Sequence, residues 1–340
     1  MNFLGYELKG AVIAASCPAT ESLENVMACA KNGAAAIILK SASGTRLGDN
    51  KTRRCFIDHM GFWSESGFDR EILPLETATA LTSSAIKNIN VPVIPSVTEM
   101  TLTPGQWLES CSALEMAGAH ALQLDFFYFP NLLSKDDFAV DFIRLLLEIN
   151  THCRIPVMPK LNISLPAEYA VYLLKKAGIE YVSLLDSIRS PAPDGAYLSG
   201  RNLSVFGTYM LPLTRQYTSV LSKAGFSVCA GGGITNAEQA ADLIRIGAKT
   251  VQIATEVLLN GFMRFGEIDC EIPLCLSLQN PQPAIRSRKV VFNADKCTCC
   301  GRCKTQVFCS VAKKLCEDNY ECEGCGLCAS LCLNHAIVFK

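Results

Sequence analysis

The sequence lacks several features that would assign it to common functional classes. Its formal net charge is only −1 over 340 residues, so no basic field favours nucleic acid or an anionic membrane. No run approaches the roughly 18 apolar residues that a membrane helix needs. Met1–Gly10 carries no apolar core of a signal peptide. These absences predict a cytoplasmic protein that binds neither nucleic acid nor membrane.

Two cofactor motifs are also missing. No Gly-x-Gly-x-x-Gly fingerprint is followed by an acidic residue, so direct binding of NAD(P)H is not expected. No Cys-x3-Cys-x2-Cys run outside the C-terminal segment suggests radical chemistry with S-adenosylmethionine. Any electrons must therefore enter by another route.

Cysteine, by contrast, is abundant and clustered. Of 18 cysteines, eight form two C-terminal runs, Cys297-x2-Cys300-x2-Cys303-x5-Cys309 and Cys322-x2-Cys325-x2-Cys328-x3-Cys332. Three thiolates spaced three residues apart can bind three irons of one 4Fe–4S cluster, and in two-cluster ferredoxins the fourth ligand comes from the other run. The spacing predicts two 4Fe–4S clusters, one held by Cys297, Cys300, Cys303 and Cys332 and the other by Cys309, Cys322, Cys325 and Cys328.

Some features of the runs leave alternatives open. Five residues rather than three precede Cys309, and no proline follows it. Cys299 and Cys316 are alternative ligands. Paired Cys-x2-Cys units also bind zinc, but two runs of three plus one suit 4Fe–4S clusters better than two four-ligand zinc sites. The other cysteines lie mostly in apolar segments, where a free thiol behaves as a small hydrophobe.

Eight short apolar segments alternate with helical patterns through residues 1–260. The expected strands are Ala11–Ser16, Ala34–Ser41, Val91–Val97, Ala121–Phe127, Pro156–Leu161, Tyr181–Ser187, Ser227–Gly232 and Thr250–Thr255. Several intervening helical patterns end at glycine, as a helix C-cap favours. We predict an α/β fold, a (β/α)8 TIM barrel over residues 1–285, rather than a doubly wound sheet. A small ferredoxin-like iron–sulfur domain should occupy residues 286–340.

A glycine-rich turn, Ala230-Gly231-Gly232-Gly233, follows the seventh expected strand and precedes a helix. Glycine lets backbone N–H groups approach a phosphate, and a helix N-terminus favours negative charge. Phosphate sites of barrels commonly lie after strands 7 and 8, where Ala254 and Thr255 also stand. The pattern predicts a phosphate site.

These features resemble the dihydroorotate and dihydropyrimidine dehydrogenase family of FMN-binding barrels, along the whole chain. The resemblance rests on Ala14-Ala15-Ser16, Lys40-Ser41, Val157–Leu161, Leu198-Ser199-Gly200, Gly231–Ile234 and Val251–Thr255. It implies FMN at the barrel mouth, with Ala15, Ser16, Lys40, Ser41 and Lys160 around its ring and ribityl chain. It places Gly200, Gly232, Gly233, Ala254 and Thr255 at its phosphate. The two cysteine runs look like the iron–sulfur module of bacterial dihydropyrimidine dehydrogenases.

Lys160 has an independent physical rationale. A cation at this strand end stabilises an anionic reduced flavin. The alternative role is a salt bridge at the barrel rim.

The substrate positions depart from that family. Its pyrimidine-handling members typically have asparagine where this chain has Asp58, Asp125 and Asp186. A carboxylate only accepts hydrogen bonds, whereas an amide also donates. With Ser187, these residues favour a small planar, nitrogen-containing or cationic substrate over orotate or uracil. Alternatively one aspartate is protonated and acts as an acid, or Asp58 is a solvated loop residue.

The expected proton donor is a second departure. The family has Cys or Ser in the loop after strand 4, where this chain has Phe129. Reducing a C=C bond needs a hydride at one carbon and a proton at the other. Tyr128 is the first candidate acid, followed by Ser134 and Lys135, although Tyr128 could instead stack on the substrate.

We therefore expect a flavin-dependent oxidoreductase acting on CH–CH or CH–NH groups. It would pass electrons between its clusters and the substrate, reducing a C=C or C=N bond. A ferredoxin or an NAD(P)H-oxidising flavoprotein subunit would donate electrons, and the chain would form a homodimer or hetero-oligomer. The alternatives are a dihydropyrimidine or dihydroorotate dehydrogenase proper, or an electron-transfer subunit with an inactive barrel.

Overall fold

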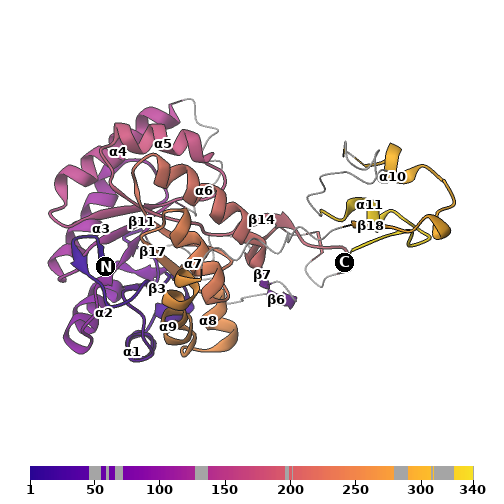
Figure 1. Cartoon of the computed structure of the whole chain (residues 1–340). Coiled ribbons are helices and arrows are strands. Elements are labelled where there is room, and N and C mark those ends of the chain that lie inside the picture. Colours follow the sequence, from indigo (N-terminus) through magenta and orange to yellow (C-terminus); the bar gives the residue numbers. More distant parts are fainter. Residues whose placement is uncertain are drawn as a thin grey trace. The chain divides into compact units, whose positions relative to one another are not determined.

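A computed structural model describes residues 1–45, 55–58, 61–65, 72–126, 137–195, 199–200, 202–278, 290–307, 309 and 325–339. Contacts divide the chain into two compact units, Met1–Leu276 and Ser277–Lys340 (Figure 1). The predicted boundary near residue 285 lies outside the described residues.

The first unit is a mixed α/β structure around a large, curled sheet of parallel strands (Figure 1). Its strands are β3 (Val12–Ala14), β4 (Ile37–Ile38), β9 (Val93–Ile94), β10 (Ser96–Val97), β11 (Leu122–Asp125), β12 (Val157–Lys160), β13 (Tyr181–Ser183), β16 (Ser227–Gly231) and β17 (Thr250–Ile253). Short strands β5 (Ala42–Ser43) and β8 (Leu73–Pro74) extend the sheet beside β10. The α/β class and the curled parallel sheet are thus confirmed.

The order of the parallel strands is consistent with a TIM-like barrel. Pairings lead from β3 to β4 and β9, from β10 through β11, β12, β13 and β16 to β17, and from β17 back to β3. Since β9 and β10 are separated only by Pro95, they form consecutive parts of one segment. Each of the eight expected strand segments contains one of these strands, or two in the case of Val91–Val97.

Helices alternate with these strands. They are α1 (Leu23–Lys31), α2 (Leu75–Asn88), α3 (Pro104–Met116), α4 (Phe138–His152), α5 (Ala167–Lys176), α6 (Leu211–Lys223), α7 (Ala237–Ile246), α8 (Thr255–Asn260) and α9 (Arg264–Ser277). Several bury apolar residues on one face, as Trp107 of α3 and Phe142 of α4 illustrate, both fully buried. Within the described ranges, no helix has the length and apolar character needed to cross a membrane.

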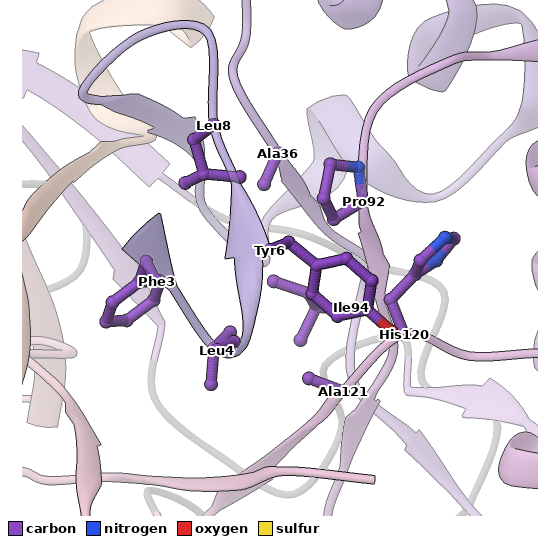
Figure 2. A pocket seen from close by; sticks show the side chains of 9 residues that line it. All are labelled: Phe3, Leu4, Tyr6, Leu8, Ala36, Pro92, Ile94, His120 and Ala121. Atoms are coloured by element: carbon purple, nitrogen blue, oxygen red, sulfur yellow. The ribbon is translucent and has the colours of Figure 1, made fainter. Parts of the chain in front are cut away.

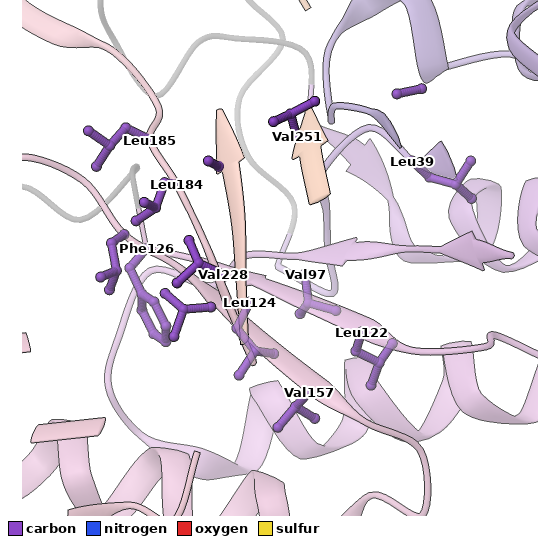
Figure 3. Packing of buried hydrophobic residues seen from close by; sticks show 14 of the residues in the cluster. Leu39, Val97, Leu122, Leu124, Phe126, Val157, Leu184, Leu185, Val228 and Val251 are labelled. Carbon is purple, nitrogen blue, oxygen red and sulfur yellow. The ribbon is translucent and has the colours of Figure 1, made fainter. Parts of the chain in front are cut away.

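Successive side chains along these strands point to opposite faces of the sheet, and both faces are buried. Figure 3 shows Leu122, Leu124, Val157, Val228 and Val251 packed in one cluster, all of them buried. Parallel strands covered by helices read as continuous apolar runs, which is why the sequence pattern located them.

An N-terminal hairpin packs beside the strand starts. Strands β1 (Asn2–Phe3) and β2 (Tyr6–Glu7) pair in antiparallel fashion around a turn at Leu4 and Gly5. Phe3, Leu4 and Leu8 join a second apolar cluster that includes Ile38 and Ile94 of the sheet. Figure 2 shows the small apolar pocket there, which Tyr6 and His120 also line.

The two long segments after the second and sixth expected strands contain a sheet that the sequence pattern did not reveal. Strands β6 (Cys55–Asp58), β7 (Gly61–Glu65), β14 (Ile188–Pro191) and β15 (Asn202–Gly207) form an antiparallel sheet in the order β14-β15-β7-β6. The pairing of β7 with β15 joins the two segments. Because this pairing links distant residues, local periodicity could not predict it.

The described residues of the second unit include two short strands and two short α-helices. Strand β18 (Val290–Phe292) pairs antiparallel with β19 (Ile337–Phe339). Helices α10 (Arg302–Thr305) and α11 (Leu327–Ser330) each follow a left-handed glycine, Gly301 and Gly326. Each glycine directly follows a cysteine of its run, so the two runs share a local backbone shape.

Candidate functional site

Three charged side chains meet where strands β11, β12 and β13 end. Lys160 is paired in register with Asp125 of the neighbouring strand. Its Nζ lies 3.5 Å from Asp125 Oδ2 and donates a close hydrogen bond to Asp186 Oδ2. Asp125 is 1% exposed and Lys160 8% exposed, so this ion-paired cluster is largely shielded from water. Breaking such a buried pair costs about 3–5 kcal/mol, because it leaves an uncompensated charge.

A chain of hydroxyl groups extends from this cluster. Ser41 Oγ donates to Asp125 Oδ2 over 3.0 Å and lies 3.2 Å from Ser16 Oγ. It also lies 3.1 Å from Ser96 Oγ. The structure thus joins five residues that the sequence analysis assigned to cofactor or substrate, namely Ser16, Ser41, Asp125, Lys160 and Asp186.

Other assigned residues follow other strands of the parallel sheet, at the same edge. Lys40 is buried, with 8% of its surface exposed, next to Ser41. Ala15 donates its backbone N–H to the carbonyl of Ile253 over 3.1 Å, which brings it next to Ala254. Ser187, which follows Asp186, is buried, and its hydroxyl has no hydrogen-bond partner in the described structure. A buried hydroxyl without a partner is costly, so a bound group would satisfy it.

The glycine turn is held in a fixed shape. Gly232 and Gly233 have φ angles of +104° and +87°. Thr214 Oγ1 lies 2.8 Å from the carbonyl oxygens of both Gly231 and Gly232, to which it donates. A Cβ on Gly233 would stand 2.6 Å from the backbone nitrogen of Leu211. Only glycine therefore fits this turn.

An arginine links the two halves of the expected phosphate site. Arg264 Nη2 donates to the carbonyl of Thr235, just after the glycine turn, over 2.9 Å. Its Nε donates to Glu256 Oε1 over 2.6 Å, at the start of α8 beside Thr255. The pKa of Arg264 is raised, chiefly by its hydrogen bond to Glu267. The sequence analysis did not identify Arg264, because this residue lies far along the chain from the glycine turn and no local pattern links the two.

Glu99 is a further residue that the sequence analysis missed. It follows β10, is fully buried and accepts four hydrogen bonds. The donors are Ser43 Oγ, Gly44 N, Thr45 Oγ1 and Ser110 Oγ, at 2.7–2.9 Å. It thus fixes the chain that leaves the second strand segment. Its place at a barrel strand end, like that of Asp125, was a signal that could have identified it.

Some assigned residues remain outside the cluster. Gly200 is exposed and has open space where a Cβ would stand. Asp58 ends β6, but its side chain lies outside the description. Tyr128, Ser134 and Lys135 lie outside the described residues, so their assignment as acids stays a prediction.

Seven of the eight assigned cluster cysteines are described, and Cys322 is not. Burial raises the pKa of Cys303, and the nearby thiols of Cys297, Cys300 and Cys332 raise it further. Cys303, Cys309, Cys328 and Cys332 also pack around the same apolar core. Among the residues that the structure describes, no three Cys, His, Asp or Glu side chains are grouped to hold a metal ion.

Comparison with known proteins gives one relative of note. Over 194 residues the chain is 27% identical to a protein from Aeropyrum pernix named "Putative dihydroorotate dehydrogenase A (fumarate)". The match covers 54% of this chain and 62% of that protein, so the chain spans less than two thirds of the relative's length. No protein-family model matches the chain.

Proposed function

We propose that this chain is an FMN-dependent oxidoreductase that passes electrons between two 4Fe–4S clusters and a small, planar, nitrogen-containing substrate. The observation that carries the proposal is the buried cluster of Lys160, Asp125 and Asp186 at the strand ends of a TIM-like sheet. The similarity to a protein named as a dehydrogenase supports the same chemical class.

The residues present fit FMN. The glycine turn at Gly232 and Gly233 precedes helix α7, whose N-terminus favours a phosphate. Lys40, which follows β4, and Lys160, which ends β12, supply two buried cations. FMN, when bound, supplies a group that exchanges hydride with the substrate and single electrons with the clusters. Thr214 and Arg264 would keep the phosphate turn in place.

The charge balance of the cluster refines the expected substrate. Two carboxylates with one ammonium group leave a net charge of about −1 when all three are ionised. Lys160 therefore compensates one of the two aspartates, and a single positive or hydrogen-donating group of the substrate would suffice. Asp186 is the better candidate to receive it, because 10% of its side chain is exposed, against 2% for Asp125.

The cysteine runs support the electron route. Cys303, Cys309, Cys328 and Cys332, which come from both runs, pack around one apolar core. The spacing predicts that Cys303 and Cys332 bind one cluster and that Cys309 and Cys328 bind the other. A ferredoxin or a flavoprotein subunit would deliver electrons there.

One alternative has support of its own. The name of the Aeropyrum pernix relative favours a dihydroorotate dehydrogenase proper, for which Lys160 would neutralise one of the two aspartates that would otherwise repel carbonyl oxygens.

The test uses protein purified without oxygen. Flavin, iron and zinc contents are measured first, and the dithionite-reduced flavin is then reoxidised by candidate substrates. Reoxidation by aminated or cationic heterocycles alone supports the proposal. Fast reoxidation by orotate or uracil supports the alternative, and no flavin in the protein contradicts both.

An aspartate variant tests the substrate-binding role directly. Asp186→Asn should weaken the binding of a cationic substrate by more than about tenfold, since hydrogen bonds to charged groups contribute about 1.5–3 kcal/mol. Asp141→Asn is the matched control, because Asp141 pairs with Arg144 on the outer helix α4. Equal affinities in wild type and Asp186→Asn would contradict direct pairing.

A further inference from the structure

The concave side of the curled sheet carries a layer of buried polar side chains. Gln252 of β17, Ser183 of β13, Gln123 of β11 and Ser96 of β10 are all at most 4% exposed. Gln123 lies two residues before Asp125 on β11, so both side chains point to the same face. Barrel interiors are mostly filled by branched apolar residues, and a buried polar group is costly unless it is hydrogen-bonded. A polar layer directly below the charged cluster therefore indicates a role.

Hydrogen bonds join these four side chains in one direction. Gln252 Nε2 donates to Ser183 Oγ over 2.7 Å, and Ser183 Oγ donates to Gln123 Oε1 over 2.9 Å. Gln123 Nε2 then donates to Ser96 Oγ over 3.0 Å. Strand β16 separates β17 from β13, and β12 separates β13 from β11, so these bonds cross the interior of the sheet. Because a side-chain amide donates from nitrogen and accepts at oxygen, the order of donors and acceptors is fixed.

This interior chain of hydrogen bonds ends on Asp125. Ser41 Oγ donates to Asp125 Oδ2 over 3.0 Å. Since Ser41 has one hydroxyl proton, its 3.1 Å contact with Ser96 Oγ must use the proton of Ser96. Ser96 can give that proton because it accepts from Gln123. Every donor from Gln252 onward therefore points towards Asp125, and aligned hydrogen bonds of this kind strengthen one another.

The two aspartates of the charged cluster stand in different surroundings. Asp125 Oδ2 accepts from Ser41 and lies 3.5 Å from Lys160 Nζ, and its side chain is almost completely buried. Asp186 accepts the close hydrogen bond from Lys160, and its side chain is more exposed. Asp125 is therefore engaged from the interior of the sheet, whereas Asp186 lies nearer to solvent.

We propose that Asp125 is a positioning residue that acts through Lys160, and that of the two aspartates it is Asp186 that pairs with the substrate. The interior chain gives Asp125 a hydrogen-bond donor besides Lys160, so the Lys160 ammonium group is left to bond Asp186 closely. The inference rests on the proposed function and refines its substrate. A single carboxylate contact calls for a planar molecule with one donor edge, such as a monoamino heterocycle, rather than one with two separate donor groups.

The test uses the full-length holoprotein and the probe 2-aminopyrimidine, which is uncharged at neutral pH and carries one amino group. Its binding is followed by the change in the flavin absorption spectrum. Asp186→Asn should raise the dissociation constant of the probe by more than about tenfold, because a hydrogen bond to a charged group is lost. Asp125→Asn should change it by less than about threefold, less than one neutral hydrogen bond contributes at most. Equal weakening by both variants would overturn the proposal, since Asp125 would then contact the substrate as well.

A second readout separates positioning from a purely structural role. Lys160 is expected beside the flavin, where a cation favours the anionic reduced form over the oxidised form. Asp125→Asn removes an anion that faces Lys160, so the ratio of the affinities for reduced and oxidised FMN should rise by at least about tenfold. Ser96→Ala should lower this ratio about threefold, because Asp125 loses support from the interior chain and draws Lys160 closer. Unchanged ratios in both variants would overturn the positioning role.

Ser96→Ala also covers the case in which Asp125→Asn folds poorly, and it then decides the positioning role by itself. Its matched control is Thr82→Val. Thr82 is equally buried, on α2, and its hydroxyl donates to the carbonyl of Ala78 in its own helix. Thr82→Val should leave both the affinity for the probe and the FMN ratio as in wild type.

Failure of this inference can be told apart from failure of the proposed function. If the wild type binds FMN but not the probe, the substrate class is contradicted, and the FMN ratios decide the positioning role. If it binds no FMN, the proposed function is contradicted, and urea unfolding decides. The unfolding equilibrium constant of the combined variant Ser96→Ala and Asp125→Asn should then differ from the product of the single effects by more than about threefold, whereas Thr82→Val combined with Asp125→Asn should agree within about twofold. Agreement in both pairs would overturn the proposal.

Discussion

His120 is a single side chain that should make the stability of the barrel depend on pH. Its Nδ1 accepts a hydrogen bond from the backbone N–H of Val93 over 3.2 Å, and its ring meets Tyr6 edge-on with centroids 5.1 Å apart. Burial lowers the pKa of His120. The folded protein therefore holds this imidazole neutral at pH values where the unfolded chain already binds a proton.

We expect the free energy of unfolding to fall as the pH drops below about 6.5, the ordinary pKa of histidine. The loss continues until the pH reaches the lower pKa of the folded state. Urea unfolding of wild type and His120→Gln, followed by tryptophan fluorescence at pH 7 and pH 5, measures it. The stability difference between the two proteins should shrink at pH 5, and parallel pH profiles would refute the assignment.

Glu99 is the second residue whose effect can be measured alone. Its carboxylate accepts four hydrogen bonds in a fully buried position, and an amide of the same shape would present two donors to groups that also donate. Glu99→Gln should therefore destabilise the protein by about 2 kcal/mol or more. Glu115→Gln, at a half-buried position of α3, is the control and should change stability by less than about 1 kcal/mol.

At the scale of elements, the glycine turn after β16 combines two constraints that can be separated. The backbone of Gly233 is left-handed, which disfavours any side chain. A Cβ there would also stand 2.6 Å from the backbone nitrogen of Leu211. Gly225, with a φ of +94°, has the same backbone constraint but open space around a Cβ. Comparison of the two positions therefore separates backbone strain from a steric clash.

Gly225→Ala should cost about 1 kcal/mol of stability through backbone strain alone. Gly233→Ala should cost more, because the backbone around Leu211 must move, and it should also weaken flavin binding. Urea unfolding and titration with FMN, followed by flavin fluorescence, measure the two effects. If both variants bound flavin as wild type does, the turn would not be the phosphate site.

The elements also show what the sequence could and could not predict. Apolar runs located the parallel strands, because both faces of this sheet are buried and the pattern is local. The antiparallel pairing of β7 with β15 joins residues far apart in the chain, so no local pattern marks it. The same holds for the site. The family resemblance identified Asp125, Asp186 and Lys160, but their mutual ion pairing depends on register between strands.

At the scale of the whole molecule, the proposed function requires each unit to bind its own redox cofactor. The first unit carries the strand-end cluster and glycine turn, and the second carries the cysteine runs. Loss of one cluster ligand should therefore interrupt electron delivery without emptying the flavin site. Cys303 is the residue with which to test this, because it is an assigned ligand of the first cluster and packs against the apolar core of its unit.

Cys303→Ser should reduce the iron content by about half, since one of two 4Fe–4S clusters loses a ligand. Its flavin content should equal that of wild type, and dithionite should still reduce the flavin, whereas reduction through an external ferredoxin should fail. Cys299→Ser is the matched control, because Cys299 neighbours the same run but is not an assigned ligand. If Cys299→Ser lost the iron instead, the ligand register would shift by one residue. If Cys303→Ser kept all its iron, the assignment of the first cluster would be wrong. If wild-type protein contained zinc in place of iron, the proposed electron route would not exist.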